Sequence, residues 1–163
     1  DIWEVIDQTV NIIRHRASKK GLELLLNVSP QIPRYILLDS VRFKQIIFKL
    51  LSNAIKFTRE REIGEIEIGA QKDENGGPVY YVRDNGRGIP AEYQEKVFGL
   101  FERLHTDREG TGIGLALVRR IIELHGGKLM IESEVSIGTS VYFTLPLATD
   151  AEITHTSHAR AAE

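Results

Sequence analysis

The chain has 163 residues, of which 42% are hydrophobic and 27% charged, and its formal net charge is −2. This length and composition predict one globular domain with a hydrophobic core, and the near-neutral charge gives no support for a nucleic-acid-binding surface. There is no cysteine, which excludes disulfides and thiolate zinc sites, and no apolar run reaches the roughly 20 residues of a membrane-spanning helix. Because the sequence begins at Asp1, we expect a fragment of a longer protein.

Hydrophobic spacing along the chain predicts a mixture of helices and strands. Apolar residues that recur every three or four positions indicate amphipathic helices, whereas short apolar or alternating runs indicate strands. In chain order, the expected elements are a helix over 2–20, strands over 22–28 and 35–38, a helix over 39–58, strands over 63–71 and 78–83, a short helix over 91–101, a helix that follows the glycine-rich stretch 110–114 and stops at Gly126, and strands over 128–133 and 139–145. Residues 102–109 are polar without any period, which predicts a loop, and residues 148–163 have little to bury, which predicts a tail.

The helix predicted over 39–58, which Asp39 or Ser40 could cap, has an informative polar side. Its apolar residues share one broad face, whereas Lys49, Asn53 and Lys56 belong to a polar stripe on the opposite face. A solvated surface explains such a stripe, and so does one wall of a polar ligand site. The stripe by itself leaves both interpretations open.

Two stretches rich in glycine also have two interpretations each. Gly110, Gly112 and Gly114 directly precede a helix, where backbone N–H groups and the positive end of the helix dipole favour an anion such as phosphate. A plain loop before a core helix fits the same residues. Residues 84–90 (DNGRGIP) place a carboxylate at a strand end beside a backbone that a ligand can approach closely, although a simple turn has the same composition.

The common nucleotide-binding motifs are absent from the chain. No Gly-x-x-x-x-Gly-Lys-Ser/Thr is present, which excludes a P-loop. Residues 84–90 follow a strand expected to lie in a hairpin, and no third glycine opens a long helix there, which argues against a dinucleotide-binding fold. The motif set of protein kinases with a Gly-rich loop, His-Arg-Asp and Asp-Phe-Gly is missing too.

Four motifs in order carry a resemblance to a known family. Residues 50–58 (LLSNAIKFT) resemble the N box, 84–90 the G1 box, 97–103 (VFGLFER) the F box and 110–115 (GTGIGL) the G2 box of the catalytic ATP-binding domain of sensor histidine kinases, within the wider group of gyrase-, Hsp90- and MutL-like ATPases. The resemblance covers roughly residues 1–147 and leaves 148–163 as a tail or linker. It implies a Bergerat-type α+β fold: a two-layer sandwich with a mixed, mostly antiparallel sheet of about five strands and about three main helices on one face.

The resemblance also implies ATP and Mg²⁺ as ligands and assigns roles to residues. Asp84 would accept a hydrogen bond from the adenine amino group, supported by Thr139, while Asn53 would hold Mg²⁺ and Lys56 would meet a phosphate. The remaining implied site residues are Gly86, Gly88 and Ile89 beside the base, Phe98 and Phe101 at the base of a lid over 102–110, Arg103, His105 or Arg108 as the basic group of that lid, and Gly110, Thr111, Gly112, Gly114 and Leu115 at the phosphates.

Lys49 departs from the family pattern, although we include it with Asn53 and Lys56 among the candidate catalytic residues. Four residues before Asn53 the family commonly has Asn, and its ATPase relatives have a catalytic Glu. A charged lysine neither coordinates Mg²⁺ nor acts as that base. Lys49 could add a phosphate contact or weaken metal binding by repulsion.

The implied function is transfer of the γ-phosphoryl group of Mg-ATP to a histidine of a separate dimerisation hairpin, and from there to the receiver domain of a response regulator. None of the five histidines here lies in a Ser-His-Glu-like phosphoacceptor motif. A stand-alone gyrase- or Hsp90-like ATPase is one alternative, against which Lys49 argues, and a regulatory module that binds ATP without transfer is another. We expect a cytoplasmic location, no nucleic-acid partner and no membrane contact by this fragment, whether the full-length protein is soluble or membrane-anchored.

Overall fold

Five strands form one sheet in the order β1-β2-β3-β5-β4 in the computed structural model, which describes residues 1–99 and 114–146. The strands are β1 (Leu24–Val28), β2 (Gly64–Lys72), β3 (Pro78–Asp84), β4 (Leu129–Glu134) and β5 (Gly138–Thr144). β1 pairs with β2 in parallel, and the other three pairs are antiparallel. The expected α+β fold with a mixed, mostly antiparallel sheet of five strands is therefore confirmed.

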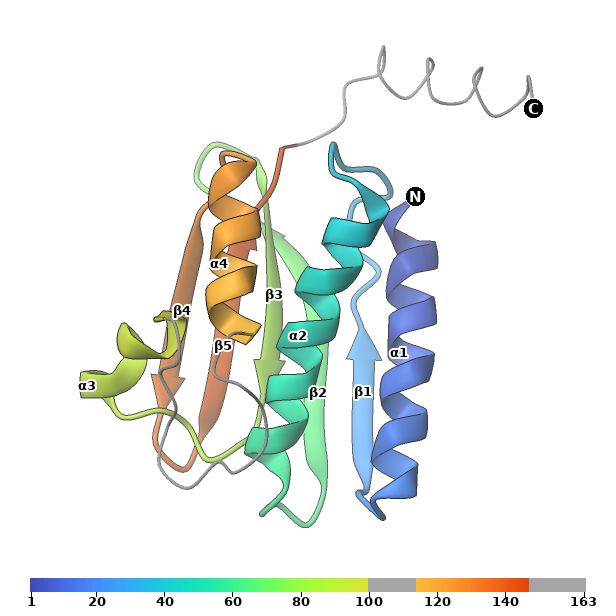
Figure 1. Ribbon diagram of the computed structural model, residues 1–163, viewed down its shortest axis with the longest axis vertical. Coiled ribbons are helices and arrows are strands. Elements are labelled where there is room, and N and C mark those ends of the chain that lie inside the picture. Colours follow the sequence, from blue (N-terminus) through green and yellow to red (C-terminus); the bar gives the residue numbers. More distant parts are fainter. Residues whose placement is uncertain (100–113, 147–163) are drawn as a thin grey trace.

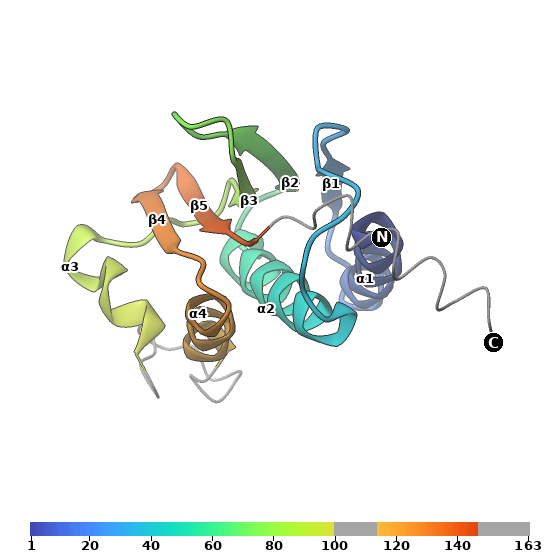
Figure 2. The ribbon, with the colours of Figure 1, turned by 90° about the horizontal axis from the view of Figure 1, so that it is seen from above.

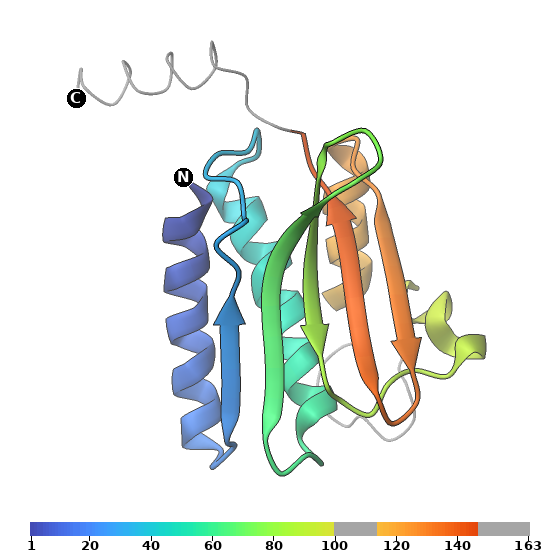
Figure 3. The ribbon, with the colours of Figure 1, turned by 180° about the vertical axis from the view of Figure 1, so that it is seen from behind.

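Three longer helices cover one face of this sheet (Figures 1 and 2). They are α1 (Ile2–Lys19), α2 (Ser40–Thr58) and α4 (Gly114–Leu124). The short helices α3 (Ala91–Gln94) and η1 (Lys96–Phe98) lie beside β4 (Figure 1). No described helix covers the opposite face, which we call the open face (Figure 3). Within the described ranges, no helix is long and apolar enough to cross a membrane.

Caps fix the starts of the first two long helices. The side chain of Asp1 accepts a hydrogen bond from Trp3 N at 2.9 Å, and that of Asp39 accepts from Val41 N at 2.7 Å. These bonds satisfy backbone donors that a helix start leaves unpaired. Of the two residues considered for the second cap, Asp39 has this role. Gly21 follows the end of α1 with a positive φ of 67°, a conformation that glycine adopts readily.

The hydrophobic core lies between the sheet and the helix layer. Alternate residues of the strands, such as Ile66, Val82 and Phe143, face the helix layer, in which the core residues of α2 include Phe43 and Leu51. Burial of a large apolar side chain contributes about 1.5–3 kcal/mol, so this interface is the main stabilising element of the fold. A smaller cluster of Val79, Tyr81 and Tyr142 packs on the open face.

Two expected elements differ in the structure. Residues 35–38 do not form the predicted strand, because Ile36 and Leu38 pack individually against the core while Tyr35 and Leu37 are exposed. The helix predicted over 91–101 is divided into α3 and η1, and the extended backbone of Gly99 (φ −74°, ψ 152°) follows η1. The other expected helices and strands agree with the structure to within one or two residues in the described ranges.

Candidate functional site

Asp84 ends β3 on the face of the sheet that the helices cover. Strand alternation puts its side chain on the same side as the core residue Val82, and its register partner across the ladder is Thr139 of β5. The Asp84 side chain is buried, with 8% exposure, and its Oδ1 accepts a hydrogen bond from Gly86 N at 2.8 Å. Burial raises the pKa of Asp84 to about 6, although backbone hydrogen bonds from Gly86 and Thr139 act in the opposite direction. Such a carboxylate is a strong acceptor in a nearly dry position.

Two glycines after Asp84 are required by close backbone contacts. A Cβ at Gly86 would lie 2.6 Å from the carbonyl oxygen of Phe57. Gly88 has a positive φ of 74°, and a Cβ there would lie 2.1 Å from the carbonyl oxygen of Glu134. The turn after β3 is thus packed tightly between the end of α2 and the β4–β5 turn. This packing holds the backbone beside Asp84 in one position.

A network of hydrogen bonds connects this turn to the last strand pair. The hydroxyl oxygens of Ser133 and Thr139 lie 2.7 Å apart, and Ser133 Oγ accepts from Ile89 N at 2.8 Å. Gln94 Nε2 donates to the carbonyl oxygens of Ile89 (3.0 Å) and Ser133 (2.9 Å). The side chain of Ile89 is buried with Phe98, Phe57 and Val97. Both main-chain groups of Ile89 are therefore fixed, and Phe98 belongs to the small cluster beneath them.

Lys49, Asn53 and Lys56 lie on one side of α2, separated by about one turn each, and all three are partly exposed. A Cβ built at Gly114 would lie 3.5 Å from Lys49 Cδ, so the first residue of α4 is next to the aliphatic part of Lys49. Leu115 follows in α4 and packs against both helix-side clusters. At Lys49, the polar stripe of α2 therefore borders the start of α4, where the helix dipole is positive.

Several expected site residues are outside the described part of the chain. They are Phe101, Arg103, His105, Arg108, Gly110, Thr111 and Gly112, together with the lid predicted over 102–110. The described site consequently has two ends. One is the group around Asp84 at the ends of β3 and β5, and the other is the group on α2 beside Gly114.

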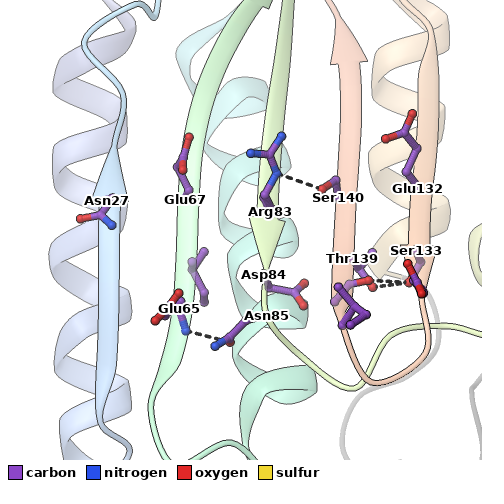
Figure 4. A pocket seen from close by; sticks show the side chains of 14 residues that line it. Asn27, Glu65, Glu67, Arg83, Asp84, Asn85, Glu132, Ser133, Thr139 and Ser140 are labelled. Atoms are coloured by element: carbon purple, nitrogen blue, oxygen red, sulfur yellow. Dashed lines mark hydrogen bonds between the residues drawn. The ribbon is translucent and has the colours of Figure 1, made fainter.

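A depression of about 490 Å³ lies at the end of the sheet and extends over the open face (Figure 4). Polar side chains from neighbouring strands line it, among them Glu67, Arg83 and Ser140, and Arg83 Nε donates to Ser140 Oγ at 3.2 Å. Asp84 and Thr139 contribute to its lining as well. Because α2 covers the other face, this depression does not bring Asp84 together with the polar stripe of α2.

Three residues of the Asp84 end were missed by the sequence analysis. Ser133 and Gln94 hydrogen-bond as described above, and Arg61 Nε donates to the carbonyl oxygen of Asn85 at 2.7 Å. Each acts on a segment more than 20 residues away in the chain. The register of β4 with β5, which places Ser133 opposite Thr139, would have been the signal for Ser133, but sequence pattern does not determine it.

Comparisons with known proteins identify the family to which the sequence belongs. The sequence model of the family described as histidine kinase-, DNA gyrase B-, and HSP90-like ATPase matches residues 38–149. The methanogenesis regulatory histidine kinase FilI of Methanothrix harundinacea is 43% identical over 145 residues, which cover 89% of this chain and 16% of that protein. The adaptive-response sensory kinase SasA of Thermosynechococcus vestitus is 36% identical over 149 residues, which cover 90% of this chain and 38% of that protein.

Solved structures give the same result. The mycobacterial sensor histidine kinase MprB superimposes with a TM-score of 0.74 at 27% identity, covering 90% of this chain and 96% of that one. Full-length ShkA in complex with AMPPNP superimposes with a TM-score of 0.75 at 33% identity, covering 91% of this chain and 30% of that one.

The chain belongs to the family of histidine kinase-, DNA gyrase B- and HSP90-like ATPases. Within that family, its fold is that of the catalytic ATP-binding domains of histidine kinases, as the resemblance implied. The chain spans 16% and 38% of the two relatives named above, so their overall activities involve much more than this domain.

Proposed function

We propose that this domain binds Mg-ATP and transfers the γ-phosphoryl group to a histidine of a separate dimerisation hairpin, from which a response-regulator receiver domain takes it. The observation that carries the proposal is the buried Asp84 carboxylate at the end of β3, beside the closely packed turn at Gly86. A buried acceptor selects adenine, whose exocyclic amino group donates a hydrogen bond, over guanine, which presents a carbonyl at the equivalent position.

The residues of α2 fit the phosphate and metal end. Asn53 offers an amide oxygen, which is a hard ligand suited to Mg²⁺. In the described ranges, no group of three or more His, Asp or Glu side chains could hold a metal ion. A single protein oxygen at Asn53 fits Mg²⁺, because Mg²⁺ at nucleotide sites usually takes one or two protein oxygens and completes its shell with phosphates and water. When bound, it would neutralise charge on the phosphates during transfer.

The roles of the chain's own residues are mainly positioning and charge stabilisation. Asp84 fixes the base, and Lys56 and Lys49 supply positive charge at the phosphates. The positive end of the α4 dipole, next to Lys49, adds to that charge. In the transfer itself, a neutral imidazole nitrogen of the hairpin attacks the γ-phosphorus in line. The bond to the β–γ bridging oxygen breaks, ADP leaves, and the other imidazole nitrogen releases its proton. The substrate ATP implies a cytoplasmic location for this step.

A reconstitution with γ-labelled ATP tests the proposal. The chain is mixed with a histidine kinase dimerisation hairpin supplied in trans, and labelled protein and free phosphate are separated and counted. Label on the hairpin histidine, lost in a hairpin with that histidine replaced by Gln, is the expected result. Steady release of phosphate without labelled hairpin would instead identify an ATPase.

A second candidate function is nucleotide binding without transfer, and Lys49 is the observation that favours it. Its ammonium lies on the same side of α2 as Asn53, one turn away, where it repels a cation held by the Asn53 amide. Tight ATP binding with neither labelled hairpin nor released phosphate would support this regulatory module.

A further inference from the structure

Arg61, in the loop between α2 and β2, bridges two turns that are far apart in the sequence. Its Nε donates to the carbonyl oxygen of Asn85 at 2.7 Å, and its Nη2 donates to the carbonyl oxygen of Gly86 at 3.0 Å. The same Nη2 also donates to the carbonyl oxygen of Ser136 in the β4–β5 turn. One guanidinium group thus joins three carbonyl oxygens of the turn after Asp84 and of the last hairpin.

The Ser136 end of this bridge is conformationally strained. Ser136 has a φ of 67°. Among the described residues, it is the one non-glycine residue with a positive φ. The left-handed region is unfavourable for residues with a Cβ and persists where surrounding bonds enforce it. Ser136 N donates to the carbonyl oxygen of Arg87 at 2.8 Å, so bonds at both its N–H and its C=O tie this residue to the bridge.

The Asn85 end is fixed from a second direction. Asn85 Oδ1 accepts from Glu65 N at 2.9 Å, and Asn85 Nδ2 donates to the carbonyl oxygen of Ile63 at 3.2 Å. Arg61 binds the carbonyl groups of Asn85 and Gly86, and Gly86 N is the donor to the Asp84 carboxylate. The Asn85 carbonyl and the Gly86 N–H belong to one peptide group. Arg61 therefore holds the oxygen of the same peptide whose N–H orients the Asp84 carboxylate.

We infer that Arg61 is a positioning residue for adenine recognition, acting through the Asn85–Gly86 backbone on Asp84 without itself contacting the nucleotide. This inference rests on the proposed function. The role requires arginine, because its planar fork directs several N–H donors along fixed lines to separate acceptors, whereas a lysine ammonium is a compact charge on a flexible stem. Positive charge at position 61 alone does not reproduce the bridge.

The test compares Arg61→Lys and Arg61→Ala with the unchanged chain, and ADP affinity is measured by calorimetry well below each variant's melting temperature. Both substitutions are expected to weaken ADP binding by about tenfold, since each removes hydrogen bonds made by a charged donor. Arg14→Ala is the matched control. It removes a single bond from an arginine to the Leu26 carbonyl oxygen (3.1 Å) between α1 and β1, and it should leave ADP affinity unchanged.

Hydrogen exchange provides a readout that is independent of the ligand. In Arg61→Lys, the Gly86 and Ser136 amides should exchange at least about tenfold faster, while amides in α1 keep their rates.

Unchanged ADP affinity in a folded Arg61→Lys protein overturns the inference and leaves the proposed function intact. An equal loss in Arg14→Ala also overturns it, because the effect would then be general. If Arg61→Ala does not fold, Arg61→Lys decides the outcome. Failure of the unchanged chain to bind ADP overturns the proposed function and the inference with it.

Discussion

The two ends of the site are built in different ways. At the end around Asp84, a main-chain hydrogen bond, close glycine contacts and the Ser133–Thr139 pair hold the polar groups in place, and the carboxylate is almost completely buried. At the α2 end, Lys49 and Asn53 are partly exposed side chains of one helix. The first end is preorganised by the fold, whereas the second depends on side chains that can adjust.

Under the proposed function, this difference separates base recognition from phosphate chemistry. A fixed acceptor discriminates between bases because an unmatched ligand cannot move it to a better position. Adjustable cations on a helix tolerate changes in the phosphates as a nucleotide is turned over. We therefore expect substitutions at the Asp84 end to act on affinity as a whole, and substitutions on α2 to act on the dependence on metal.

The largest effect is expected for Asp84→Asn. The new amide presents an N–H₂ group where adenine also presents one, so ADP affinity measured by calorimetry should fall by about 100-fold or more. The same substitution removes a carboxylate with a raised pKa and should stabilise the protein by about 1–3 kcal/mol at pH 8, measured by urea unfolding. Asp73→Asn in the β2–β3 turn is the control, and its ADP affinity should be unchanged. Intact binding by Asp84→Asn would remove Asp84 from the site.

The next effect is expected for Asn53→Ala. Loss of its amide oxygen should lower ADP affinity by about tenfold in Mg²⁺, while the affinity in EDTA changes little. Calorimetric titrations in both buffers measure the two values. Asn11→Ala, on the exposed side of α1, is the matched control and should leave both affinities as they are. An equal loss in both buffers would contradict a role in metal binding.

The pH dependence should separate the two ends as well. The pKa of Asp84 is raised from 3.8 to about 6, so between about pH 4 and pH 6 the folded chain keeps a proton that the unfolded chain has lost. This group therefore lowers stability as pH rises through that window, and the charged acceptor exists only above it. We expect ADP affinity to fall by about tenfold per unit below pH 6, and urea unfolding of Asp84→Asn to lack this contribution to the pH dependence. A flat affinity profile from pH 5 to 7 would contradict the role of the carboxylate.

The smallest effect is expected for Lys49→Asn. This change removes a positive charge next to Asn53 and adds a second amide oxygen, so the ratio of ADP affinities with and without Mg²⁺ should rise by about threefold. Lys44→Asn on the same helix serves as the control. An unchanged or falling ratio would contradict repulsion of the metal by Lys49.

Much of the fold could be predicted because its determinants are local. Helical spacing in α1 and α2 and alternation in β2 set the limits of these elements, and Asp39 has the capping role expected from its type. Residues 35–38 mislead for a physical reason: an apolar run indicates burial, and burial there is achieved without a partner strand. The parallel pairing of β1 with β2 is likewise a long-range property that no local pattern contains.

The site could be predicted only in part. Asp84, Gly86 and Asn53 belong to motifs in which residue type and spacing are themselves informative. Arg61, Ser133 and Gln94 act through carbonyl oxygens and amides of distant segments, up to 75 positions away in the chain for Arg61 and Ser136. An arginine in a polar loop looks like any solvated charge until the fold places its acceptors. Supporting residues of this kind become visible only in three dimensions.

The parallel pairing of β1 has a practical consequence for dissecting the chain. The sequence model of the family begins at residue 38, so a truncated fragment cut at that boundary would lack α1 and β1. It would uncover the part of the core that Ile6 and Ile13 fill and would leave β2 as an unprotected edge strand. Bare apolar surface beside an unpaired strand edge promotes aggregation. We therefore expect the minimal folding unit to include α1 and β1, which lie ahead of the boundary that sequence similarity suggests.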